Sequence, residues 1–143
     1  MAALIALCAD SDRAVRKFAC FAIGNAGFHD ASLYPALRPA VPPLVGLLRD
    51  EEDRTRANAA GALGNLVRNS SALCRDVLAA GALQALLEVV RRPAGGAGAG
   101  AGGPDGNTAV QIALFSLGEQ RELPHLALNV SLQTRQSTLG SSA

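Results

Sequence analysis

The chain has 143 residues, of which 49% are hydrophobic, but only 3% are aromatic and none is Trp. A core made mainly of Ala, Leu and Val suits closely packed helices and suits a sandwich or barrel poorly. The net charge of +1, the lack of a signal-peptide pattern and the lack of a long apolar run argue against a nucleic-acid or membrane partner and favour a cytoplasmic location.

The first predicted element is an apolar helix over residues 1–9, and its pattern recurs over residues 42–50 and 84–92. This element comes second in the repeating unit, so the chain is expected to begin inside a repeat, as a fragment would. Three apolar side chains are then without an N-terminal neighbour: Leu4, Ile5 and Leu7. Because solenoids need capped ends, we expect self-association through this uncapped N-terminal helix.

The next helix is predicted over residues 14–27, and its sequence is repeated. An Ala, a hydrophobic residue four positions later and an adjacent Gly occur in three copies: Ala19, Ile23 and Gly24; Ala59, Leu63 and Gly64; Ala113, Leu117 and Gly118. The first two copies end at Asn25 and Asn65, which are 40 residues apart. Such a period with helical patterning is typical of a solenoid of helix pairs or triplets.

Two faces are predicted for the helix over residues 14–27. Five apolar or small residues recur at the spacing that places them on one side of a helix, and we expect this side to face the core: Val15, Ala19, Ala22, Ile23 and Ala26. Three residues four positions apart share another face: Lys17, Phe21 and Asn25.

Acidic segments precede the two long helices, at residues 10–13 and 50–53. Acidic side chains can cap the N–H groups at a helix start, and the helix dipole favours negative charge there. We interpret these segments as solvated helix starts rather than as an acidic docking site. Gly81 is expected to break the chain between two of the remaining helices, which are predicted over residues 32–37, 41–49, 54–68, 72–79 and 82–92.

The composition changes after residue 92. Residues 93–107 are rich in Gly and Ala, which bury little surface, and we expect a flexible insertion between two helices of one repeat. The third copy follows over residues 109–119, and residues 124–143 are expected to be a mostly disordered tail. The predicted repeat domain therefore spans residues 1–123.

The segment from Val15 to Asn25 resembles the third helix of armadillo repeats, and the segment from Gly81 to Leu86 resembles the start of their second helix. The resemblance covers residues 1–92 and 108–120. It implies an all-α fold, a right-handed armadillo/HEAT-like superhelical solenoid of about three partial repeats.

A narrower resemblance rests on Val15–Ala26, Pro35–Leu37, Ala40–Pro42 and Ala62–Leu66, which are similar to the C-terminal repeat region of the fused-type serine/threonine kinases. That family carries an N-terminal kinase domain and is associated with hedgehog signalling and with motile cilia. The resemblance implies a non-catalytic scaffold region of such a kinase, with a cytoplasmic and cilium-associated location. The alternative is a stand-alone armadillo adaptor unrelated to a kinase.

Candidate binding residues follow from the armadillo resemblance. In peptide-binding members, the Asn of the third helix bonds the ligand backbone, because a carboxamide offers both a donor and an acceptor. A Trp one turn earlier packs on the ligand. The implied peptide-groove candidates are Lys17, Phe21, Asn25, Asn65, Gln111, Phe115 and Glu119.

Three features weaken or qualify this ladder. Gly61 stands at a Trp position and offers no wall, and Glu119 cannot donate a hydrogen bond. In addition, Asn25 and Asn65 have an alternative role, in which they cap or bridge neighbouring helices.

No catalytic residue, metal site or cofactor is expected. Cys8, Cys20 and Cys74 lie in apolar helical patterns and suit the core, and no Cys or His has zinc-site spacing. The Gly98–Gly103 segment matches a nucleotide fingerprint only formally, since it follows a helix in low-complexity sequence. Kinase catalytic motifs are absent from the sequence. The expected partner is a protein segment or the rest of a longer chain.

Overall fold

The computed structural model describes residues 1–68 and 70–91, which are helical with short connections and contain no strand. Three longer helices are α2 (Arg13–His29), α5 (Asp53–Val67) and α7 (Ala82–Arg91). The shorter α-helices are α1 (Ala2–Ala6), α3 (Tyr34–Leu37), α4 (Val41–Leu47) and α6 (Ser71–Ala79), with 3-10 turns at Leu7–Ala9, Ala31–Leu33 and Arg38–Ala40. The predicted helices are thus confirmed within these residues, with small differences at their ends.

Several expectations concern residues outside the described ranges. These are the Gly/Ala-rich segment 93–107, the third copy at 109–119 and the tail 124–143. The end of the predicted domain at residue 123 and the candidate site residues Gln111, Phe115 and Glu119 also lie there. They stay predictions.

Local side-chain chemistry explains where the helices begin. Asp12 caps α2, because its carboxylate accepts a hydrogen bond from the Ala14 N–H at 2.7 Å. Ser70 caps α6 by accepting from the Leu73 N–H at 3.2 Å. Between α6 and α7, Gly81 has a φ of 82°, a left-handed conformation that glycine adopts without steric cost. It is therefore the break that the sequence predicted.

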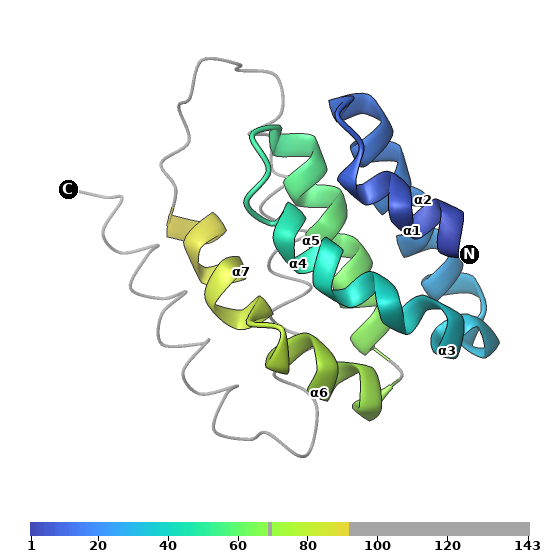
Figure 1. Ribbon diagram of the computed structural model, residues 1–143. Coiled ribbons are helices and arrows are strands. Elements are labelled where there is room, and N and C mark those ends of the chain that lie inside the picture. The colour runs from blue at the N-terminus through green and yellow to red at the C-terminus, as the bar shows by residue number, and fades with distance from the viewer. Residues whose placement is uncertain (69, 92–143) are drawn as a thin grey trace.

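The helices form a stack in chain order (Figure 1). Helix α1 corresponds to α4, and α2 corresponds to α5, with a shift of about 40 residues set by the internal repeat. Within this stack α2 packs along α5, α4 packs on α5, and α6 contacts α4, α5 and α7. Each described repeat therefore buries its apolar side against the next one, as expected for a solenoid.

The core consists of Leu, Val, Ile, Ala and Cys side chains between these layers. Its fully buried large members are Ile23, Leu37, Val41, Leu44, Leu48, Leu63, Leu66, Val67, Val77 and Leu86. The three cysteines are buried within it, which confirms the expected packing role.

The predicted core stripe of α2 needs a correction. Ala19 and Ile23 are buried, but Val15, Ala22 and Ala26 are only half-buried. The buried face instead includes three residues outside the predicted stripe: Cys20, Gly24 and Gly27. The reason is that α5 covers the Gly24 side of α2, whereas the described residues leave the opposite side partly open.

Candidate functional site

Helices α2 and α5 approach each other closely because Gly24 has no side chain. A Cβ atom at Gly24 would lie 3.1 Å from the Cα of Ala62 and 3.2 Å from its Cβ. Such contacts are shorter than ordinary van der Waals distances between carbon atoms. The small residues therefore place the exposed faces of the two helices side by side.

Two asparagine side chains of α5 donate hydrogen bonds to the backbone of α2. The Nδ2 of Asn65 donates to the carbonyl oxygen of Gly24 at 3.0 Å, and the Nδ2 of Asn58 donates to that of Lys17 at 3.1 Å. Asn65 therefore bridges neighbouring helices, which was the alternative role considered for it. Its Oδ1 has no donor among the described residues, so the amide still offers one acceptor to a ligand.

Two exposed phenylalanines lie on the α2 side of this junction. Phe21 and Phe28 are 54% and 51% exposed. The Arg68 guanidinium lies over the Phe28 ring at 5.1 Å, which joins α2 to the end of α5. We call the exposed side of this junction the α2–α5 face. It consists of Phe21, Asn25 and Phe28 on α2, of Gly61 and Asn65 on α5, and of Arg68 directly after α5.

The structure gives the remaining candidates different settings. Asn25 is exposed and its side chain has no hydrogen-bond partner among residues 1–68 and 70–91. Lys17 is half-buried, and its ammonium lies 3.6 Å from the Glu52 carboxylate. Lys17 therefore forms an ion pair at the start of α5. The described candidates that remain accessible on the α2–α5 face are Phe21, Asn25 and Asn65.

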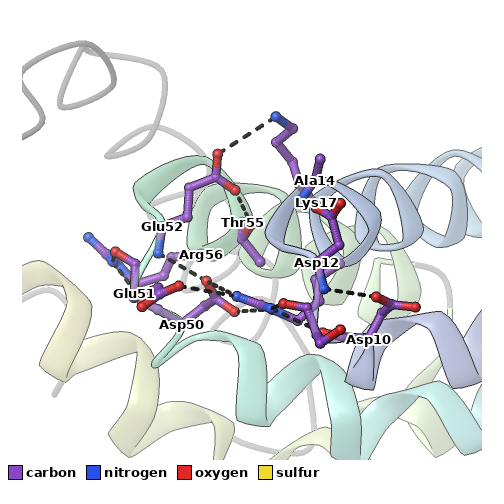
Figure 2. A network of polar contacts seen from close by, with 11 residues as sticks. Asp10, Asp12, Ala14, Lys17, Asp50, Glu51, Glu52, Thr55 and Arg56 are labelled. Carbon is purple, nitrogen blue, oxygen red and sulfur yellow. Dashed lines mark hydrogen bonds and ion pairs between the residues drawn. The ribbon is translucent and has the colours of Figure 1, made fainter.

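A network of polar contacts ties the first described repeat to the second (Figure 2). Its centre is Arg16 with Asp50: Arg16 Nε donates to Asp50 Oδ2 at 2.7 Å, and Nη2 donates to Oδ1 at 3.3 Å. The side chains are only 14% and 5% exposed, respectively. Two hydrogen bonds between one guanidinium and one carboxylate fix both the distance and the relative orientation of the two repeats. We call this contact the Arg16–Asp50 fork.

Arg16 also forms hydrogen bonds to the loop that precedes its own helix, α2. Arg16 Nη1 donates to the carbonyl oxygens of Asp10 and Ser11, each at 3.0 Å. The acidic segments are therefore more than solvated helix starts, which corrects the interpretation from sequence. Asp50 belongs to the interface between repeats. Glu52 lies at the N-cap position of α5, but its side chain accepts no hydrogen bond from the first N–H groups of that helix.

The charges within this network set the ionisation of Asp50. Burial opposes ionisation of the carboxyl, but hydrogen bonds from Arg16 and the Glu52 N–H outweigh burial and hold the pKa of Asp50 below its usual value. An aspartate with a lowered pKa contributes stability at neutral pH, where it is charged in the folded and the unfolded state.

Acidification is therefore expected to remove this contribution. The loss begins near the unfolded pKa of aspartate, about 4, and is complete once the pH has fallen below the lower folded pKa of Asp50. Asp50→Asn keeps an oxygen for the Glu52 N–H but cannot titrate. Urea unfolding at several pH values between neutral and strongly acidic should thus show a shallower acid loss for Asp50→Asn than for the unmodified chain. Equal slopes would contradict the role given to Asp50.

The thiol of Cys20 is a poor candidate for chemistry. A hydrogen bond with Cys8 and burial both raise the pKa of Cys20 above its ordinary value. A buried thiol that is protonated at neutral pH is a weak nucleophile. Within the described part of the chain there is also no group of three His, Cys, Asp or Glu residues that could hold a metal ion. Of the described helices, none has the length and apolarity needed to span a bilayer.

The comparisons with known proteins agree with a repeat fold. The sequence model of the HEAT-repeat family matches residues 1–97. A designed armadillo repeat protein in complex with the peptide (KR)4 superposes with a TM-score of 0.74 at 21% identity, over 89% of this chain and 51% of that one. An engineered protein superposes with a TM-score of 0.76 at 20% identity, over 90% and 51%. These structures show likeness of fold.

Curated relatives include protein kinases. The chain is 56% identical over 55 residues to serine/threonine-protein kinase TIO of Arabidopsis thaliana, covering 38% of this chain and 4% of that protein. It is 33% identical over 130 residues to serine/threonine-protein kinase 36 of Pongo abelii, covering 91% and 9%. The chain thus spans less than a tenth of the length of either kinase and is similar to a small part of each.

Proposed function

The chain belongs to the HEAT-repeat family, and from that premise we propose that it is a non-catalytic protein-interaction module that binds an extended peptide on the α2–α5 face. The observation that carries the proposal is the pair of half-exposed phenylalanines beside a partly satisfied asparagine. Phe21 and Phe28 offer apolar contact, and the unused Oδ1 of Asn65 offers an acceptor to a peptide N–H.

The charge around this face indicates the kind of peptide. Helix α2 contains no Asp or Glu, and the one carboxylate of α5, Asp53, is paired with Arg56. Arg54 and Arg68 are exposed. An extended peptide that alternates carboxylates with aromatic or aliphatic side chains complements such a surface, whereas a basic peptide is repelled.

We further propose that the module is a scaffold region of a fused-type serine/threonine kinase with a role in hedgehog signalling and ciliogenesis, in the cytoplasm and at the cilium. The similarity to part of kinase 36 and of TIO supports the kinase context. The signalling and ciliary roles rest on the resemblance to the fused-type family. In this context the catalytic step belongs to a separate kinase domain, and the repeat region positions partners for it.

Binding of short labelled peptides tests the proposed surface. In fluorescence anisotropy with the full chain, the octapeptide (EF)4 is expected to bind and (KR)4 is expected not to. Replacing both Phe21 and Phe28 by Ala should weaken (EF)4 binding about tenfold or more, because the few central anchor residues of an interface cost above about 1 kcal/mol each when truncated.

The matched control is Leu7→Ala. Leu7 is also an exposed apolar residue, but it follows α1, away from the α2–α5 face. Its replacement should leave (EF)4 binding unchanged, and circular dichroism should show equal helix content in all variants. Equal binding of (EF)4 and (KR)4, or an unchanged affinity in the double Phe variant, would contradict the proposal.

A further inference from the structure

We propose that Arg68 is the residue by which the α2–α5 face selects an acidic ligand: its guanidinium binds a carboxylate of the extended peptide through two hydrogen bonds. The inference rests on the proposed function, in which the same face binds the peptide. It goes further in assigning the choice of ligand charge to one side chain. It follows from the place of Arg68 on the face, from the ring that holds its guanidinium and from the surrounding charges.

Arg68 lies on the same side of α5 as the other α5 residues of the face. Its backbone is still helical, with φ of −54° and ψ of −38°, and its N–H donates to the Gly64 carbonyl oxygen at 3.1 Å. Gly61, Asn65 and Arg68 are thus spaced by four and three residues, which places them in one row along the helix. Asn65 is half-buried, whereas Arg68 at the end of this row is exposed.

An aromatic ring of α2 holds the guanidinium in place. The central carbon of the Arg68 guanidinium lies over the Phe28 ring, 5.1 Å from its centroid. The negative face of the ring attracts this cation, and the planar guanidinium still has N–H donors to offer to an acceptor. Because this contact already restricts a long side chain, less conformational freedom is lost when a ligand binds.

The Phe28 ring is itself held by a neighbour. The His29 ring packs edge-on against it, with centroids 5.0 Å apart and an interplanar angle of 89°. Phe28 nevertheless remains 51% exposed. Phe28 can therefore position the Arg68 guanidinium and also offer apolar contact to the peptide.

The carboxylates that follow α2 and α5 in the chain bind elsewhere. Asp30, directly after His29, accepts from the Ser32 N–H at 2.8 Å, and Asp76 accepts from Arg38 Nη2 at 2.8 Å. Within residues 1–68 and 70–91, Arg68 forms no ion pair with a carboxylate. Its charge is therefore available to a carboxylate of a ligand.

The other cations near the face have different surroundings. The Lys17 ammonium lies 3.6 Å from the Glu52 carboxylate. Arg54 is exposed, but it directly follows three acidic residues, at positions 51–53. These negative charges oppose the approach of an acidic peptide at that end of α5, so the attraction for a carboxylate is concentrated at Arg68.

A charge cycle on protein and peptide tests this role. The affinities of (EF)4 and of the uncharged (QF)4 are measured by fluorescence anisotropy with the full chain. A salt concentration of about 0.15 M screens attraction beyond about 8 Å, so that the contact itself is measured. The unmodified chain should bind (EF)4 about fivefold more tightly than (QF)4, because two charge-assisted hydrogen bonds are lost in (QF)4.

Replacing Arg68 by Gln should remove this preference. The two peptides are then expected to differ by less than about twofold, since the protein change and the peptide change remove the same interaction. Arg68→Lys keeps the charge but lacks the planar group that can donate to both carboxylate oxygens. It should therefore keep only part of the preference for (EF)4.

Arg13→Gln is the matched control. Arg13 is exposed like Arg68, but it begins α2 and lies 15 residues before Phe28, about 22 Å along the helix. Its replacement changes the net charge equally and should leave the preference for (EF)4 unchanged. Circular dichroism should show the same helix content in all variants.

The possible failures are distinguishable. If neither peptide bound to the unmodified chain, the proposed function itself would be wrong, and with it the role of Arg68. If (EF)4 bound but kept its full advantage over (QF)4 in Arg68→Gln, only the role of Arg68 would be overturned. An equal loss of the preference in Arg13→Gln would also overturn it, because a general charge effect would then explain the result.

Discussion

Asp50→Ala is expected to lower the free energy of unfolding by about 2–4 kcal/mol. The change removes the partner of the Arg16 guanidinium, which is largely buried, and the acceptor for the Glu52 N–H at the start of α5. Arg16 keeps its bonds to the Asp10 and Ser11 carbonyls, so the loss is smaller than for a fully buried charge left alone. Urea unfolding followed by circular dichroism measures it.

Asp10→Ala is the matched control for this change. It removes the equivalent turn bond, Asp12 N–H to Asp10, but no arginine fork. We expect a loss of at most about 1 kcal/mol, the usual contribution of one hydrogen bond. If the two variants were destabilised equally, the fork between the repeats would not be the source of the Asp50 effect.

Gly24→Leu is expected to destabilise the chain by about 1–3 kcal/mol. Even the first side-chain atom would meet the backbone of Ala62 at 3.1 Å, and a backbone cannot rotate away as a side chain can. The helices α2 and α5 must therefore move apart, which also weakens the hydrogen bond from Asn65 to Gly24. The gain in helix propensity over glycine, about 1 kcal/mol at most, offsets only part of this cost.

Gly61→Leu provides the opposite case on the neighbouring helix. No atom from outside its own stretch of α5 lies within 4 Å of a Cβ placed there. Removing a glycine from the middle of a helix should then stabilise the chain by up to about 1 kcal/mol. The two substitutions are expected to change the urea midpoint in opposite directions, and a shift in the same direction would contradict the close approach of α2 and α5.

Much of the fold follows from patterns that are local in the sequence. The spacing of apolar residues predicts α2 and α5, and Gly81 marks the break before α7. The internal repeat also predicts the stacking, because equivalent helices must bury equivalent faces. The direction of the α2 core face was predicted less well, since it depends on which neighbour covers Gly24 and which side is left open.

The candidate site was harder to predict, because its contacts join residues about 40 positions apart. The Arg16–Asp50 fork was missed, and a charge-rich helix start by itself gives no sign of a partner in another repeat. A signal was present in the repeated pairing of Asp10 with Arg16 and of Asp50 with Arg56 at one spacing. Asn25 and Asn65 match in sequence but differ in setting, because only Asn65 has a described helix to bond.

The proposed ligand of the α2–α5 face is an extended peptide with acidic and aromatic side chains. The most direct test is the amide NMR spectrum of the isotope-labelled full chain, titrated with unlabelled (EF)4. Saturable shifts are expected, concentrated around Phe21, Phe28 and Asn65, and they should be lost in the Phe21→Ala/Phe28→Ala variant. An absence of shifts, or shifts confined to α4, α6 and α7, would contradict it.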